Sequence, residues 1–267
     1  MKGEGLNIYW GDYYNNTIAI YPRSGTNPPE KGLITKGVSG PERLFVDSAL
    51  TVYATNIGNN TITAYKRHRT RPSLRISSGV ADPTGITVDA AGTIYCANTG
   101  TKTITVYPKG QTTPSLSIPI PGTPEYLAID GSDNLYVSYF GGPTGTAVME
   151  FAPGSTTGKD LGLDMGGGGA LEVDRSGNII IADNYGSTLD FFPAGQTELK
   201  KRIGMPGGGE IFGLSLSETE HKMFLSVWTN GTFSIQQVNY PNLTSLTTKL
   251  STNAGNWPIA VARDAVL

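Results

Sequence analysis

An apolar run that ends in aspartate recurs along this chain with nearly constant spacing, and this repeat constrains the fold more than any other feature. Close copies end at residues 47, 89, 130 and 174, and divergent copies end at residues 217 and 264, so the intervals are 42, 41, 44, 43 and 47 residues. A second marker has the same period: an alternating apolar run opens at Thr17, Thr61, Thr103, Thr188 and Thr232, with Ala147 in the fourth slot. A period of this length is typical of repeat architectures.

Each repeat carries four short strand patterns separated by turn residues. In the third repeat we predict strands over Gly85–Val88, Thr93–Ala97, Thr103–Tyr107 and Ser115–Ile120. These runs are β-branched or aromatic, and Gly, Asn, Asp or Pro bound them. Four strands in each repeat of about 40–50 residues predict an all-β propeller in which one repeat forms one blade.

The two ends of the chain predict how the ring closes. The chain starts with the pattern of a second strand, Leu6–Trp10, and finishes with the pattern of a first strand, Pro258–Ala262. We therefore predict a single six-bladed β-propeller over residues 1–267, made of four-stranded antiparallel blades. Repeats start near residues 41, 83, 124, 168 and 211, and the C-terminal strand within 258–267 completes the N-terminal blade, 1–40. Such closure removes two exposed strand edges.

The repeat resembles the NHL-repeat six-bladed propellers. Their pattern of Pro-x-Gly-Ile-x-Val-Asp followed by Gly-x-Ile-Tyr-Val-Ala-Asn stands here as Pro83–Asp89 and Gly92–Asn98. The chain is also distantly similar to two related groups of propellers, the gluconolactonase and paraoxonase calcium hydrolases and the streptogramin lyases. These resemblances imply a fold, whereas function has to be argued from a site.

Composition excludes several classes of protein. With 16% charged residues, a net charge of −2 and a pI near 5.7, the chain does not have the basic character of a nucleic-acid-binding protein. No apolar run approaches the roughly 18 residues that span a bilayer. Its one cysteine, Cys96, excludes an intrachain disulfide and is expected to be buried. The abundance of Thr, Asn and Gly favours a secreted or periplasmic bacterial protein whose leader has been removed.

Antiparallel strands divide the loops between two ends of the ring. We call top the end that carries the blade-to-blade connections and the loops between second and third strands, and bottom the opposite end. Both histidines, His68 and His221, fall in bottom hairpins of different blades. The two histidines therefore do not converge on one site for catalysis. The streptogramin lyases depend on a histidine at the top, and this chain has none there.

Two carboxylates are expected at the top mouth of the central tunnel. The residue before each repeat glycine points there, and these six positions hold Glu42, Thr84, Glu125, Gly169, Phe212 and Ile259. Glu42 and Glu125 are candidate acid–base residues or, with Asn98 and Asp183 at second-strand ends, candidate ligands for Ca²⁺ or another divalent cation. Strand-end Asp and Asn also cap turns, and Arg43 follows Glu42, so a structural role is the alternative. The calcium hydrolases hold their metal at these positions, and only the two glutamates carry over.

Aromatic residues also gather at the top. Candidate ligand contacts are Tyr14, Tyr126, Tyr139, Tyr185, Phe212, Trp228 and Trp257, although some of these rings are expected to pack between blades. The glycine runs at 166–169 and 207–209 are expected to permit tight turns or loop movement.

Three functions stay open from the sequence. The first is a binding propeller for a small molecule, glycan or peptide at the top face. The second is a divalent-cation-dependent hydrolase of esters, lactones or phosphoesters that uses the top carboxylates. The third is a structural role in an oligomer.

Overall fold

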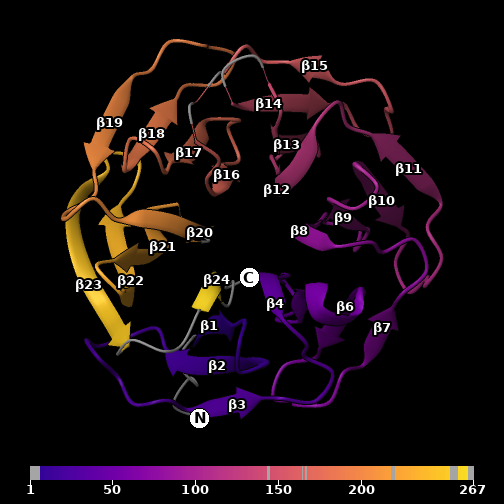
Figure 1. Cartoon of the computed structure of the whole chain (residues 1–267), viewed down its shortest axis with the longest axis horizontal. Coiled ribbons are helices and arrows are strands. Elements are labelled where there is room, and N and C mark those ends of the chain that lie inside the picture. The colour runs from indigo at the N-terminus through magenta and orange to yellow at the C-terminus, as the bar shows by residue number, and fades with distance from the viewer. Residues whose placement is uncertain are drawn as a thin grey trace.

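A computed structural model describes residues 7–142, 145–163, 165, 167–217, 220–252 and 258–263; of residue 252 and of 258–263 it describes the backbone. The described residues form a ring of six four-stranded antiparallel sheets around a central tunnel (Figure 1). The chain is therefore a six-bladed β-propeller, as the repeat predicts.

Each blade runs from an inner strand at the tunnel to an outer strand at the rim. In that order, blade 1 contains β24 (Pro258–Arg263), β1 (Asn7–Asp12), β2 (Thr17–Pro22) and β3 (Gly32–Ile34); blade 2 contains β4 (Pro41–Val46), β5 (Val52–Asn56), β6 (Thr61–Tyr65) and β7 (Leu74–Ile76); and blade 3 contains β8 (Pro83–Val88), β9 (Ile94–Asn98), β10 (Thr103–Tyr107) and β11 (Leu116–Pro119). A short 3-10 helix, η1 (Ile57–Asn59), joins β5 to β6.

The other half of the ring follows the same plan. Blade 4 contains β12 (Thr123–Ile129), β13 (Leu135–Phe140), β14 (Thr146–Phe151) and β15 (Lys159–Asp160); blade 5 contains β16 (Leu171–Val173), β17 (Ile179–Asp183), β18 (Thr188–Phe192) and β19 (Lys201–Gly204); and blade 6 contains β20 (Glu210–Leu216), β21 (Lys222–Thr229), β22 (Thr232–Asn239) and β23 (Thr244–Thr252). Blade 6 has the longest strands of the six blades. It is also the blade in which the sequence repeat is most divergent.

Apolar side chains from both faces of each blade form the core between neighbouring blades. On β4, Leu44 and Val46 pack in a cluster with Tyr9 of blade 1, whereas Phe45 packs against the cluster that contains Ile86 of blade 3. Successive side chains of a strand point to opposite faces, so one inner strand joins two blades. Full burial of each such side chain contributes about 1.5–3 kcal/mol.

The aspartates that end the repeat close the bottom hairpins. The Oδ1 atom of Asp47 accepts the backbone N–H of Thr51 at 2.8 Å, and its Oδ2 accepts the hydroxyl of Tyr53 at 3.0 Å. Asp89, Asp130 and Asp174 accept the equivalent backbone bonds. This marker of the repeat is therefore explained by turn structure and needs no catalytic role.

Strand β24 closes the ring. It pairs antiparallel with β1 from Ile8 opposite Arg263 to Gly11 opposite Ala260, and it forms the inner strand of blade 1 (Figure 1). This confirms that the C-terminal strand completes the N-terminal blade.

Two further expectations bear on the described part of the chain. It contains no helix that is long and apolar enough to cross a bilayer. Cys96 is completely buried in β9, and burial raises the pKa of its thiol. A buried thiol of raised pKa is a packing residue and not a nucleophile.

Candidate functional site

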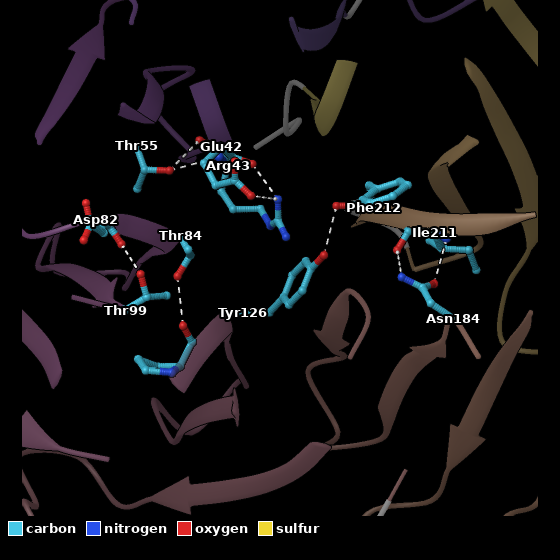
Figure 2. A network of polar contacts seen from close by, with 11 residues as sticks. Glu42, Arg43, Thr55, Asp82, Thr84, Thr99, Tyr126, Asn184, Ile211 and Phe212 are labelled. Atoms are coloured by element: carbon cyan, nitrogen blue, oxygen red, sulfur yellow. Dashed lines mark hydrogen bonds and ion pairs between the residues drawn. The ribbon is translucent and has the colours of Figure 1, made fainter. Parts of the chain in front are cut away.

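Three blades meet across the tunnel through a crossbar formed by Arg43, Tyr126 and Phe212. The guanidinium carbon of Arg43, from blade 2, lies 3.9 Å from the ring centroid of Tyr126, from blade 4. The Tyr126 hydroxyl donates a hydrogen bond of 3.2 Å to the carbonyl of Phe212, from blade 6 (Figure 2). A cation over an aromatic face is attractive, most of all where water is excluded. The crossbar therefore links blades 2, 4 and 6 across the tunnel.

The bottom part of the tunnel holds a cavity of about 690 Å³. It extends from Arg43 and Tyr126 along the inner strands to bottom-hairpin residues such as Asp133, Arg175 and Glu220. Glu42 and Glu125 are not among its lining residues. The two carboxylates predicted at the tunnel mouth therefore do not line this cavity.

Glu42 is neutralised by its neighbour. Nη1 of Arg43 lies 3.2 Å from Oε1 of Glu42 and also donates to the Glu42 carbonyl at 2.6 Å. Burial raises the pKa of Glu42, and the Arg43 guanidinium partly opposes this shift. The alternative that the sequence left open, in which Arg43 pairs with Glu42, is the arrangement that the structure contains.

Glu125 is buried without such a neutralising contact. Its Oε2 atom is fully buried and has no hydrogen-bond partner. Burial raises the pKa of Glu125; Arg43 acts in the opposite direction, and the negative charge of Glu42 adds to the rise. Glu42 therefore lies close enough to raise the pKa of Glu125. Arg43 influences both carboxylates but forms its ion pair with Glu42.

The other two candidate metal ligands do not join the glutamates. Asn98 is completely buried; its Oδ1 accepts the backbone N–H of Ala81 at 3.0 Å, and its Nδ2 donates to Thr105 Oγ1 at 2.9 Å. Asp183, on β17 of blade 5, accepts the backbone N–H of Gly186 at 3.1 Å. Both side chains shape turns and connections, as strand-end Asn and Asp commonly do.

The donor set does not fit the calcium site that the resemblance implies. Within the part of the chain that the structure describes, no three His, Cys, Asp or Glu side chains come together to hold a metal ion. A hard divalent cation prefers several carboxylate and carbonyl oxygens. Here one glutamate is paired with arginine, and Asn98 has no free amide group.

The predicted aromatic contacts divide into exposed and packed rings. Tyr14 and Tyr185 are 65% and 80% exposed. Tyr126 and Tyr139 are buried, whereas Phe212 and Trp228 pack against the core between blades 6 and 1. Trp257 lies outside the described residues. Of the predicted aromatic residues that the structure describes, Tyr14 and Tyr185 are exposed, whereas the others are packed, a distinction that the sequence did not make.

A third exposed ring, Phe140, completes the rim. It ends β13 and is 49% exposed. Phe140 and Tyr185 belong to the neighbouring blades 4 and 5, and Tyr14 lies in the β1–β2 loop of blade 1, with its ring 5.2 Å from that of Tyr13. We call Tyr14, Phe140 and Tyr185 the aromatic rim.

The first glycine run is explained by close packing. A Cβ on Gly167 would lie 2.6 Å from the Tyr185 ring, and a Cβ on Gly168 would overlap Oε2 of Glu125. A Cβ on Gly169 would overlap the carbonyl of Ala182. None of these three glycines has a positive φ, so they serve close approach: Gly168 to blade 4, and Gly167 and Gly169 to residues of blade 5. In the second run, Gly207 and Gly208 do adopt positive φ, in a tight turn.

The histidines lie where the sequence places them, in separate hairpins. His68 lies between β6 and β7 of blade 2, and His221 lies between β20 and β21 of blade 6. Neither belongs to the crossbar, to the lining of the cavity or to the aromatic rim.

Sequence reasoning missed two residues near Glu125, Ser138 and Thr146. Both side chains are completely buried, and their hydroxyl oxygens have no hydrogen-bond partner. No sequence signal identifies them, because serine and threonine occur at many strand positions in this chain.

Comparison with known proteins supports the fold. No family model matches the sequence, and no curated protein matches it. Among solved structures, a chain of a nidogen/laminin complex superposes with a TM-score of 0.77 at 15% identity, covering 97% of this chain and 98% of that one. A streptogramin B lyase gives a TM-score of 0.68 at 13% identity, covering 97% of this chain and 86% of the lyase.

A third similar structure is a catalytically inactive histidine-to-alanine variant of virginiamycin B lyase from Staphylococcus aureus with quinupristin. Its TM-score is 0.63 at 11% identity, and 94% of this chain and 86% of the lyase are covered. Identities this low establish the propeller fold alone, and this fold carries both enzymes and proteins found in complexes with other proteins.

Proposed function

We propose that this protein is a binding propeller whose top face holds a small molecule, glycan or peptide. One observation carries the proposal: Tyr14, Phe140 and Tyr185, the exposed aromatic side chains of the described residues, all lie at the top end, two of them in loops and Phe140 at the end of β13. The other exposed large apolar side chains, Leu33 and Leu199, lie on outer-strand segments. Exposed aromatic rings gathered at one end are typical of a binding surface.

The electrostatics of the same face support this proposal. The acidic residues Glu42 and Glu125 lie at the top end of the inner strands, and Arg43 neutralises one of them. Apolar walls beside a few polar groups are what a ligand site needs, because apolar contact supplies affinity and polar groups supply orientation.

The hydrolase alternative is not favoured by any observation. A lyase-like reaction that uses a top-face histidine has no residue here to perform it, since both histidines lie in bottom hairpins. A divalent-cation reaction would need ligands besides Glu42 and Glu125, and Asn98 and Asp183 are engaged elsewhere.

The experiment is a screen of immobilised glycans, peptides and small molecules with the parent and a triple variant, Tyr14→Ser, Phe140→Ser and Tyr185→Ser. The matched control is Leu33→Ser with Leu199→Ser, which removes exposed apolar surface from the outer circumference of the propeller, away from the aromatic rim. We expect ligands that bind the parent and the control to lose at least about tenfold in affinity for the triple variant. Equal binding by all three proteins would place the ligand site elsewhere.

A further inference from the structure

Three buried oxygen atoms without hydrogen-bond partners occur together on one side of blade 4. They are Oε2 of Glu125, Oγ of Ser138 and Oγ1 of Thr146. Buried polar atoms are nearly always hydrogen-bonded in native proteins, so each exception calls for an explanation. Three exceptions on neighbouring strands of one sheet point to a missing common partner.

Strand register places Ser138 and Thr146 on the same face, and Glu125 precedes them in the β12 bulge between Pro124 and Tyr126. Ser138 of β13 pairs with Tyr126 of β12 on one side and with Val148 of β14 on the other. Thr146 precedes Val148 by two residues and therefore points to the same face. Tyr126 and Val148 pack in the cluster shared with blade 5, so this face is the one toward blade 5.

Gly168 covers two of these atoms from the blade 5 side. The position of a Cβ on Gly168 would overlap Oε2 of Glu125 and lie 3.2 Å from Oγ1 of Thr146. The carboxylate and the threonine hydroxyl therefore face each other beside Gly168. All three residues lie near the top ends of their strands.

Charge and hydrogen-bonding capacity define the partner. Arg43 contacts Glu42 and acts on Glu125 only electrostatically, so Oε2 of Glu125 remains without a hydrogen-bond partner. One carboxylate matches one positive charge, and two hydroxyl groups add two further acceptors. A primary ammonium group has one charge and three N–H donors with no acceptor. A divalent cation would require more carboxylate oxygens.

We infer that Glu125, Ser138 and Thr146 form a binding site for a primary ammonium group. The inference rests on the proposed function only in taking the top face as the binding face. The ammonium group comes either from a small free amine or from a lysine side chain of a peptide. Both present the same chemistry to the site.

The test measures thermal melting of the whole chain with increasing methylammonium chloride. Tetramethylammonium chloride is the control salt, because it carries the same charge without N–H donors. We expect methylammonium to raise the melting temperature of the parent in a saturable manner and tetramethylammonium to leave it unchanged. Identical effects of the two salts on the parent would overturn the inference.

Two isosteric variants test the residues. Thr146→Val and Ser138→Ala remove one acceptor each and should weaken methylammonium binding by about tenfold or more. The free variants should melt at or above the parent's temperature, because an unpartnered buried hydroxyl is removed. The matched control is Thr188→Val in blade 5, which also removes a hydroxyl without a partner. A methylammonium response of Thr146→Val equal to that of the parent and of Thr188→Val would contradict the site.

A second arm identifies the source of the ammonium group. Binding of a lysine-containing peptide is compared with binding of the same peptide trimethylated at its lysine. Tighter binding of the unmodified peptide than of the trimethylated peptide indicates a lysine side chain, whereas equal binding of the two peptides beside a methylammonium response indicates a small amine. Loss of ligand in the aromatic-rim variant with an unchanged methylammonium response would separate the two proposals.

Discussion

Blades 2 and 4 use equivalent positions in different ways. In blade 2, Thr55 accepts the backbone N–H of Arg43 at 2.9 Å, and Glu42 is paired with Arg43. In blade 4, the equivalent hydroxyl of Ser138 and Oε2 of the equivalent Glu125 have no partner. The same backbone therefore carries a satisfied polar cluster in one blade and an unsatisfied cluster in the other.

In blade 3, the polar residues at the equivalent positions have purely structural roles. Thr84 takes the place of the glutamate and donates to the carbonyl of Pro124 at 2.9 Å (Figure 2). Asn98 occupies the position that Tyr139 holds in blade 4, and it bonds the connection before its own blade. Polar groups kept without partners lower stability, and proteins retain such groups mainly at functional sites. The contrast is the reason why blade 4 is proposed to contribute to binding.

The largest expected effect is in blade 3. Asn98→Ala leaves the backbone N–H of Ala81 and the hydroxyl of Thr105 without their partner inside the core. We expect the free energy of unfolding to fall by about 3 kcal/mol, because two buried polar groups lose their hydrogen bonds. Urea denaturation measures this loss. Ser117→Ala on exposed β11 is the control and should change stability by less than about 0.5 kcal/mol.

The second-largest effect is expected from a substitution in blade 2 that leaves Glu42 without a partner, as Glu125 is in blade 4. Arg43→Met leaves Glu42 buried without its counter-charge and should lower stability at neutral pH by about 1–3 kcal/mol. The pKa of Glu42, already raised by burial, should rise further without Arg43. A carboxyl group whose pKa is raised on folding stabilises the protein below its unfolded pKa, and this contribution is lost as pH rises through the folded value.

The stability deficit of Arg43→Met relative to the parent should therefore grow as pH increases above about 4 and shrink in acid. Urea denaturation from pH 4 to pH 8 measures this. A deficit that does not change with pH would mean that Arg43 acts through its stacking on Tyr126 and not through the charge of Glu42.

A smaller effect compares one position in two blades. Thr55→Val should cost about 1 kcal/mol, because the N–H of Arg43 loses its acceptor. Ser138→Ala should cost nothing or increase stability, because its hydroxyl has no partner to lose. Equal losses in the two variants, measured under identical denaturing conditions, would show that Ser138 is as well satisfied as Thr55.

The smallest expected effect concerns divalent cations. Calcium, magnesium and manganese chlorides should leave the melting temperature of the parent within the range of an ionic-strength control, and Glu42→Gln and Glu125→Gln should behave in the same way. A parent stabilised by one of these ions but not by the others, with the effect lost in both variants, would restore the cation-dependent hydrolase.

The sequence by itself determined the architecture. A period near 43 residues with four strand patterns per repeat leaves few alternatives to a propeller, and the split first repeat predicts closure through β24. These are local signals: alternation decides which face of a strand is buried, and turn residues decide where strands end. Cys96 and the hairpin aspartates could be placed for the same reason.

Only the tertiary structure decided the site. The crossbar joins Tyr126 to Phe212 across 86 residues of sequence, and the contact of Thr84 with Pro124 spans 40. Whether a side chain at a repeated position is paired depends on the neighbouring blade, which no local pattern specifies. For that reason Glu42 and Glu125 read alike in sequence, whereas in the folded protein Arg43 neutralises the first and the second, beside Ser138 and Thr146, lacks a partner.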